Sequence, residues 1–452
     1  MKLTVAAVQL AGRPLDDWRA TRQQITEAIL HARACTDAEL IVLPEGAWPA
    51  YAFESPAAYQ ARLDAGMPDE PATLRWLGDL AQRMCAGICV GCVFPRAGRL
   101  ANLAVLIGPN GRVLGEHQKV FLWDFDHDLY APGERIEPVE TPWGRVGLFV
   151  CADARMPEIP ATLVARGARL LLQPTAWVNC GTPQRPWNPQ PDFLIRSRAA
   201  ELRVSVVSAS KSGRELDTAF VGQSLVCEAD GRIAAQVRDE PAAFAAATIE
   251  LPPRGRVTCP GPCRARLLSQ APPIRPPAES PTVRIWFAPC ALPDAADDAG
   301  VDLCITPPGQ RCKRLPASDR AGVLHVAGPC EELLQCAALR VCALRDRDLA
   351  SFAPLRAAAL DGAALAIVFG DELPAFHVQT RAAENRIFVL AVGPQRWRLY
   401  DPTGRERAGG TIEPHRPAQE PALVFDPSPA ADKRFAPCTD AFADRRVELY
   451  EF

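Results

Sequence analysis

The feature that most constrains the fold of this chain is an internal repeat. Residues 340–369, RVCALRDRDLASFAPLRAAALDGAALAIVF, align without a gap with residues 145–174, RVGLFVCADARMPEIPATLVARGARLLLQP. Further echoes follow in the same order: 283–289 resembles the start of the chain, 380–393 resembles 197–210, and 401–405 resembles 228–232. Ordered self-similarity is the mark of a duplicated structural unit. We therefore expect one scaffold to be built twice, with a shorter second copy.

A proline-rich segment separates the two halves. The chain has 452 residues, enough for two or three domains. Residues 271–282, APPIRPPAESPT, cannot continue a helix or an inner strand, because proline lacks the backbone N–H and fixes its own φ. We expect a first domain over residues 1–270, a linker over 271–282 and a second domain over 283–452.

Strand-like and helical patterns alternate along the chain and predict an α/β fold. An amphipathic stretch over 17–35 is typical of a helix, and strand-like runs occupy 3–9, 40–43, 88–94, 104–107, 146–150, 170–172 and 204–209. Asn110-Gly111 and Asp230-Gly231 each separate two strand-like runs and predict antiparallel hairpins. The sheets are therefore expected to be mixed.

Composition excludes several classes of partner. The net charge of −3 leaves no basic excess to bind nucleic acid. The apolar runs, such as 363–369, fall far below the ~18 residues that a membrane span requires.

The N-terminus lacks the pattern of a secretory signal, and many of the 16 cysteines lie in apolar runs that suit reduced thiols, so we expect a cytoplasmic protein. No metal or cofactor is expected, because the C-x3-C-x2-C pattern over 85–92 lies on a strand-like run that would split its ligands between two faces.

Three polar residues each follow a strand-like run, which is where α/β folds place their sites. Glu45 follows LIVLP, Lys119 follows the hairpin strand in EHQKVFLWDFD, and Cys151 follows VGLFV. These residue types together suit attack on a carbon–nitrogen bond. Cys151 would attack, Glu45 would accept its proton, and Lys119 would donate to the developing oxyanion.

The surrounding motifs resemble those of the nitrilase superfamily of carbon-nitrogen hydrolases. The motifs, in order, are LPEGAWPAY, HQKVFLWDFDHDLYAPGE, VGLFVCADARMPE, QPTAW and RSRAAEL. The resemblance covers residues 1 to about 268. It implies a four-layer α-β-β-α sandwich and a Glu, Lys, Cys triad at Glu45, Lys119 and Cys151.

The resemblance also suggests further site residues. Family members often carry a second active-site Glu, and Asp126 occupies that position, although Asp128 stands nearby. The backbone N–H of Ala152 is expected to join Lys119 in the oxyanion site. Arg155 would either anchor a substrate carboxylate or form a structural ion pair with Glu158 or another acid. Candidate pocket walls are Trp48, Trp123, Trp177 and Trp187.

The motif around the nucleophile narrows the expected reaction. Cys151 begins C-A-D-A-R-M-P-E, which is similar to the amidase and carbamoylase branches, whereas nitrile-hydrolysing members typically have Trp-Glu after the cysteine. This favours hydrolysis of a small carboxamide or ureido (N-carbamoyl) compound through a Cys thioester. Nitrile hydrolysis and acyl transfer through the same thioester stay open, as does a non-catalytic scaffold.

The second half has lost the triad. Pro308 aligns with Glu45, Asp346 aligns with Cys151, and the hairpin that carries Lys119 has no counterpart. We expect a degenerate nitrilase-like domain without catalytic residues. Helices expected over 349–360 and 380–386 correspond to those through which family members pair, so the second half is expected to act as a built-in partner in a pseudo-dimer, with further homo-oligomers possible.

Overall fold

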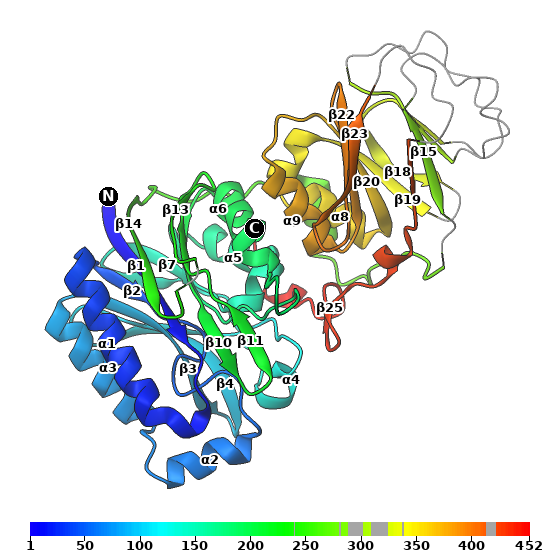
Figure 1. The fold of residues 1–452 in the computed structure, drawn as a ribbon. Coiled ribbons are helices and arrows are strands. Elements are labelled where there is room, and N and C mark those ends of the chain that lie inside the picture. Colours follow the sequence, from blue (N-terminus) through cyan, green and yellow to red (C-terminus); the bar gives the residue numbers. More distant parts are fainter. Residues whose placement is uncertain (239, 280–281, 288–301, 309–323, 337–338, 413–421) are drawn as a thin grey trace. The chain divides into compact units, whose positions relative to one another are not determined.

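The chain divides into two compact units (Figure 1). The structure is a computed structural model that describes residues 1–238, 240–279, 282–287, 302–308, 324–336, 339–412 and 422–452. The first unit comprises Met1–Val257 together with Ala436–Thr439 and Asp444–Phe452. The second comprises Thr258–Phe435 and Asp440–Ala443.

The first sheet of the first unit is mixed, with strand order β11-β10-β1-β2-β3-β4-β5 and β14 paired to β1. Its strands are β1 (Lys2–Ala11), β2 (Leu40–Val42), β3 (Gly87–Arg96), β4 (Arg99–Ile107), β5 (Val113–Gln118), β10 (Lys211–Glu215), β11 (Thr218–Val221) and β14 (Ala243–Glu250). β1, β2 and β3 run parallel, whereas β4 and β5 form the hairpin predicted at Asn110-Gly111. The parallel strands therefore point their carboxyl ends to one edge.

The second sheet has the order β13-β12-β9-β8-β7-β6. Its strands are β6 (Val139–Thr141), β7 (Gly144–Leu148), β8 (Leu170–Pro174), β9 (Ser205–Ala209), β12 (Leu225–Cys227) and β13 (Ile233–Gln236). β7, β8 and β9 are parallel, and β12 and β13 form the hairpin predicted at Asp230-Gly231. This sheet packs face to face on the first one, through β8 and β9 against β1, β2 and β3.

Helices cover the outer faces of both sheets (Figure 1). α1 (Trp18–Thr36) and α3 (Glu70–Met84) lie on the first sheet, and α5 (Glu158–Ala165) and α6 (Ile195–Leu202) lie on the second. α2 (Pro56–Asp64) and the short α4 (Asp126–Leu129) lie in connections. The layers are thus α-β-β-α, as the resemblance implied.

Local sequence explains the first of these helices. α1 buries Trp18, Ile25 and Ile29 on one stripe, the spacing that an amphipathic helix requires. It ends at Asp37, which takes a left-handed conformation with φ of 52° and returns its N–H to the Arg33 carbonyl. The prediction of a helix over 17–35 is confirmed to within one residue at each end.

The second unit repeats much of this topology. Its sheets have the orders β17-β16-β15-β24 and β18-β19-β20-β21-β22-β23. The first has β15 (Val283–Phe287), β16 (Leu303–Ile305), β17 (Leu324–Val326) and β24 (Leu423–Phe425), and the second has β18 (Cys330–Cys336), β19 (Leu339–Arg345), β20 (Ala363–Phe369), β21 (Phe388–Val392), β22 (Arg396–Tyr400) and β23 (Glu406–Thr411). Strand order and direction match β3-β2-β1-β14 and β6-β7-β8-β9-β12-β13 of the first unit.

Helices of the second unit begin at different residues from those expected. The helix expected over 349–360 is α8 (Ala353–Leu360), because a 3-10 turn over Asp346–Ala350 comes first. The one expected over 380–386 is α9 (Ala375–Asn385), which begins directly after a proline. α7 (Gly261–Leu267) precedes the proline-rich segment, where the Ile274 N–H donates to the Leu360 carbonyl at 2.8 Å. Residues 280–281 of that segment lie outside the described residues.

One buried ion pair occurs at matching places in both units. In α6, Arg198 pairs with Glu201 at 2.7 Å and donates through Nε to the Ala154 carbonyl. In α9, Arg381 pairs with Glu384 at 2.7 Å and donates through Nε to the Leu349 carbonyl. Sequence alignment matches all three positions, so the same side-chain network joins the helix to the 3-10 turn after the strand in each unit.

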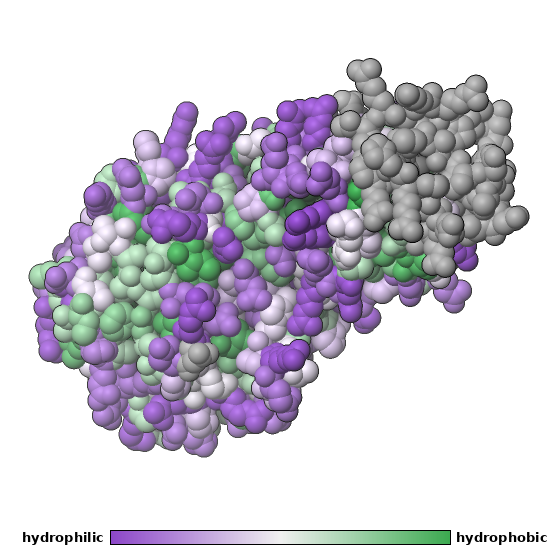
Figure 2. Space-filling model, turned by 45° about the horizontal axis from the view of Figure 1, so that its top comes forward, coloured by the Kyte–Doolittle hydropathy of each residue, from purple (hydrophilic) through white to green (hydrophobic). Residues whose placement is uncertain are grey.

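Among the described residues, no helix combines the length and the apolar character needed to cross a membrane. Hydrophilic and hydrophobic residues are interspersed on the face shown in Figure 2. The large exposed apolar side chains are single residues spread along the chain, namely Met1, Leu30, Val113, Leu216, Ile274 and Val424.

We predict that Arg381→Met lowers the free energy of unfolding by ~3–5 kcal/mol, because it leaves the buried Glu384 carboxylate without its guanidinium. The double variant Arg381→Met/Glu384→Leu should recover most of this loss. Urea unfolding of the full chain, followed by circular dichroism, measures both. A single variant as stable as the wild type would contradict the assigned role of the pair.

Candidate active site

Cys151 stands at a sharp turn at the carboxyl end of β7. It opens a 3-10 turn (Cys151–Arg155) and takes φ of +45°, a left-handed conformation that is costly for a residue with a Cβ. The side chain of Gln173, from β8, donates to the Cys151 carbonyl at 2.9 Å. Strained backbone persists only where its surroundings fix it, and it concentrates at functional sites. The turn holds the thiol at the sheet edge, where it is 6% exposed.

Glu45 lies at the neighbouring edge of the first sheet, after β2. Its carboxylate is fully buried and accepts from Lys119 Nζ and Asn102 Nδ2 at 2.7 Å each through Oε1. Through Oε2 it accepts from the Ala176 N–H at 3.0 Å. Cys151 belongs to the same buried cluster, because the Glu45 carboxylate acts on the pKa of its thiol. Both sheets therefore contribute to one cluster.

Lys119 follows β5 and joins two carboxylates. Its ammonium lies 2.7 Å from Glu45 Oε1 and 2.6 Å from Asp126 Oδ2, with all three side chains buried. Asp126 also accepts from the Trp123 N–H at 2.8 Å, and its Oδ1 has no hydrogen-bond partner among the described residues. Asp128, the alternative from sequence, is exposed on α4. The geometry thus places Asp126 beside the lysine.

Burial and charge set the protonation of this cluster. Burial raises the pKa of Cys151 to about 12, and the Glu45 carboxylate acts in the same direction. Burial also raises the pKa of Glu45, although Lys119 opposes this. Burial lowers the pKa of Lys119, but the Asp126 and Glu45 carboxylates outweigh it and the net pKa is raised. The Cys151 thiol is therefore protonated at neutral pH and must lose its proton to react.

Asp153 ties the lysine and cysteine segments together. Its Oδ1 accepts from the N–H groups of Val120 and Phe121 at 3.1 and 2.8 Å. Its Oδ2 accepts from the Val150 N–H at 2.8 Å, and His117 Nε2 lies 3.0 Å away. A carboxylate that accepts several hydrogen bonds holds its donors firmly. Asp153 lies in the motif around the nucleophile, two positions after Cys151, but the sequence alone does not predict its part in the site.

Arg155 and Trp123 lie together. The Arg155 guanidinium lies 4.8 Å from the centre of the Trp123 ring, and the side chain is largely buried. Burial lowers the pKa of Arg155, with charge interactions from Cys180 and Cys151 opposing the shift. Ala152, the expected oxyanion donor, is buried directly after the nucleophile. Glu158, considered as an ionic partner of Arg155, lies 3.4 Å from Arg445.

The remaining tryptophans differ in their surroundings. Trp48 packs edge-on against Trp18 and Trp76 in the core beneath α1 and α3. Trp177 follows β8 and is buried, and its backbone N–H donates to Ser210 Oγ at 3.3 Å. Trp187 is half-buried, with its ring 6.4 Å from that of Phe193. Their predicted role as pocket walls stays a prediction.

Two further residues contact the triad without having been predicted. The side chain of Asn102, on β4, donates to Glu45. The backbone carbonyl of Asn102 accepts from the backbone N–H of Lys119 at 2.9 Å. The Tyr51 ring lies 5.3 Å from Lys119 Nζ. Tyr51 lies in the LPEGAWPAY motif, so the sequence offered a reason to expect it near the site. Nothing in the sequence distinguishes Asn102 from the other residues of its hairpin strand.

The first unit is thus an α-β-β-α sandwich in which a cysteine, a glutamate and a lysine are buried together after the ends of strands. Comparison with known proteins identifies the family. Residues 4–256 match the carbon-nitrogen hydrolase family. The chain belongs to this family.

Individual relatives are consistent with the family match. An omega-amidase of Saccharomyces cerevisiae is 27% identical over 250 residues, covering 52% of this chain and 83% of its own. An omega-amidase of Homo sapiens is 30% identical over 230 residues, covering 48% and 78%. Among solved structures, an amidase from Nesterenkonia sp. is 26% identical with a TM-score of 0.48, covering 56% of this chain and 91% of its own.

We predict that Asp153→Asn lowers the free energy of unfolding of the first unit by ~1–3 kcal/mol, because the amide places a donor against backbone N–H groups. The matched control is Asp348→Asn, at the aligned position in the second unit, where the carboxylate accepts from the Arg345 N–H. Thermal unfolding of both variants checks this. Equal losses in the two variants would contradict a special role for Asp153.

Proposed function

We propose that this protein hydrolyses the carbon–nitrogen bond of a small carboxamide or N-carbamoyl compound through a thioester on Cys151. The observation that carries the proposal is the buried contact of Glu45 with Lys119 at 2.7 Å, together with the buried thiol of Cys151, whose pKa both groups shift. This arrangement joins a nucleophile, a base and an oxyanion donor in one cluster. The omega-amidase relatives support amides over nitriles as substrates.

The geometry supports a balanced reaction in two halves. In the first, Cys151 Sγ bonds to the carbonyl carbon while its proton passes to Glu45, and Lys119 and the Ala152 N–H stabilise the oxyanion. Glu45 then returns the proton to the nitrogen, the carbon–nitrogen bond breaks, and ammonia or an amine leaves. In the second half, water loses a proton to Glu45 and attacks the thioester. The carbon–sulfur bond breaks, the acid leaves, and Cys151 regains its proton.

Asp126 and Arg155 have distinct proposed roles. Asp126 holds the Lys119 ammonium in place, and its Oδ1 is available to the departing nitrogen. Arg155 binds a carboxylate at the far end of the substrate, with Trp123 fixing the guanidinium plane. Such a contact would select amides that carry an acidic group.

We propose that residues 1–270 form the catalytic domain and that 283–452, joined by 271–282, are a degenerate copy. The matching strand orders and the paired Arg198–Glu201 and Arg381–Glu384 contacts support this. The copy has Asp346 in place of the nucleophile. An aspartate cannot form the thioester, so the chain would carry one working site. Pairing of the two as a pseudo-dimer stays a prediction.

We predict a covalent adduct on Cys151 when the protein is incubated with a slowly hydrolysed amide, detected by intact-mass and peptide spectrometry. Cys151→Ala should form no adduct and release no ammonia. The matched control is Cys342→Ala, because that thiol is equally buried and its pKa is likewise raised to about 12. Activity that survives Cys151→Ala, or is lost in Cys342→Ala, would contradict the proposal.

We predict that kcat/KM falls at low pH with a midpoint above the 4.5 of an ordinary glutamate. Glu45 must be ionised to accept the thiol proton, and burial raises its pKa, so activity disappears as pH falls through that raised value. Because the pKa values of Lys119 and Cys151 are raised, activity should not fall as pH passes the 9.0 of an ordinary thiol. A pH profile with an acid midpoint at or below 4.5 would show that Glu45 is not the base.

A further inference from the structure

The last residues of the chain belong to the first unit. This C-terminal segment comprises Ala436–Thr439, which includes part of β25 (Arg434–Ala436) and of β26 (Thr439–Asp440), and Asp444–Phe452, which contains a 3-10 turn over Val447–Leu449. Resting on the proposed function, we infer that Thr439 and Arg445 in this segment are positioning residues of the active site. They act through the loop that carries Asp126 and through the helix that follows Cys151.

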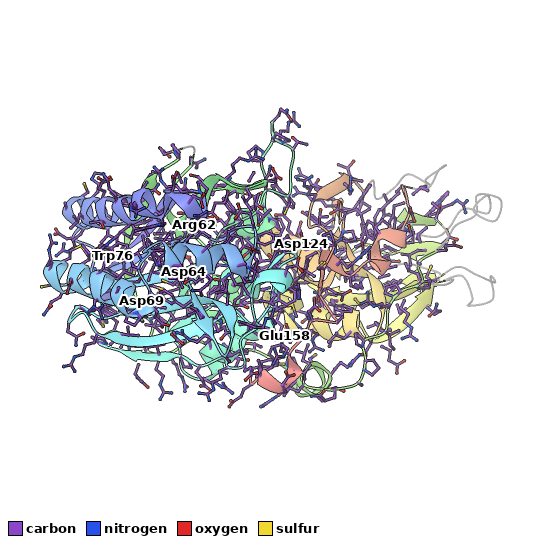
Figure 3. All side chains as sticks on the ribbon, turned by 90° about the horizontal axis from the view of Figure 1, so that it is seen from below. Arg62, Asp64, Asp69, Trp76, Asp124 and Glu158 are labelled. Carbon is purple, nitrogen blue, oxygen red and sulfur yellow. The ribbon has the colours of Figure 1, made fainter. Side chains whose placement is uncertain are left out.

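Thr439 fixes the loop in front of Asp126. Its buried Oγ1 accepts from the Asp124 N–H at 2.6 Å and lies 3.4 Å from the Leu122 carbonyl, to which it donates. Asp124, labelled in Figure 3, has φ of +36°, a conformation that needs such external support. Trp123 comes directly before Asp124 and donates its backbone N–H to Asp126, two residues after Asp124. One hydroxyl therefore sets the loop that aims Asp126 at Lys119.

Arg445 neutralises a buried charge behind the nucleophile. Its guanidinium lies 3.4 Å from Glu158, the first residue of α5 (Figure 3), and both side chains are buried. A buried carboxylate is costly when its cationic partner is removed. Nearby, the Glu451 N–H donates to Thr162 Oγ1 on the same helix at 2.9 Å. The segment thus holds α5, which starts just beyond the turn of Cys151.

The segment also supports the lysine. Arg446 Nη1 donates to the Gly133 carbonyl at 3.4 Å, and the Gly133 N–H donates to the Lys119 carbonyl at 2.7 Å. A site that is held within a fraction of an ångström loses much of its rate when a supporting contact is removed. The residues up to Val257 contain the whole triad but lack these contacts. On this inference, the C-terminal segment, which follows most of the second unit in the sequence, completes the site of the first unit.

The test is the rate at which iodoacetamide alkylates Cys151 in the full chain, quantified by peptide mass spectrometry. This reaction depends on the assembled thiol site and not on turnover. The exposed Cys85 serves as the internal reference in each sample. Thr439→Val should slow Cys151 alkylation at least ~10-fold while Cys85 reacts at the wild-type rate, and Thr439→Ser should restore it to within ~3-fold. Arg445→Met should act in the same direction as Thr439→Val.

The matched control is Thr403→Val, which removes a threonine hydroxyl that donates to Asp401 at 2.6 Å in the second unit. It should leave Cys151 alkylation unchanged. Wild-type reactivity in Thr439→Val, no rescue by serine, or equal slowing in Thr403→Val would overturn the inference. A Thr439→Val chain unfolded at 25 °C would overturn it too, because the hydroxyl would then serve the fold.

Amide turnover separates this inference from the proposed function. If the wild type releases no ammonia from any amide, the proposed function fails, whereas the effect of Thr439→Val on alkylation still supports positioning. If the wild type turns over an amide, Thr439→Val should lower kcat by at least ~10-fold and change KM by less than ~2-fold. A change confined to KM would contradict a role in holding Asp126 and Lys119.

Discussion

The site depends on a buried chain of charges, in which Lys119 lies between the carboxylates of Glu45 and Asp126. Removing three ionised groups from water is expensive, and only close contacts and further hydrogen bonds compensate for it. Asn102 and the Ala176 N–H supply these for Glu45, and the Trp123 N–H supplies one for Asp126. Loops and strand ends of both sheets must therefore meet with little freedom, and Cys151 is presented to a carboxylate whose pKa burial has raised.

The sandwich makes this meeting possible. The parallel strands β2 and β7 end at neighbouring edges of two packed sheets, which brings Glu45 and Cys151 together. Asp153 then links the segment that carries Lys119 to the end of the strand that precedes Cys151. Its carboxylate accepts from the Val120 N–H in the first and from the Val150 N–H in the second. The described residues of the second unit show the same strand order and a matching buried arginine–glutamate pair, and Asp346 stands at the position that aligns with Cys151.

Much of this could be predicted from sequence, for physical reasons. Strand patterns bounded by Glu45, Lys119 and Cys151 are local signals, and both hairpins follow from Asn-Gly and Asp-Gly turns. The role of Asp153 could not be read, because it depends on backbone donors that carry no residue-specific signal. Thr439 bonds to Asp124 from 315 positions away, and one hydroxyl at that separation leaves no pattern. The core position of Trp48 likewise depends on α1 and α3 packing around it.

The most direct test of the account is ammonia release by the purified full chain across linear amides, N-carbamoyl compounds and nitriles, run in parallel with Cys151→Ala and Lys119→Ala. The account predicts release from at least one amide or N-carbamoyl compound, none with Cys151→Ala, and a loss of ~100-fold or more in kcat with Lys119→Ala, because an oxyanion donor is removed. Release that persists in Cys151→Ala, or release from nitriles alone, would contradict it.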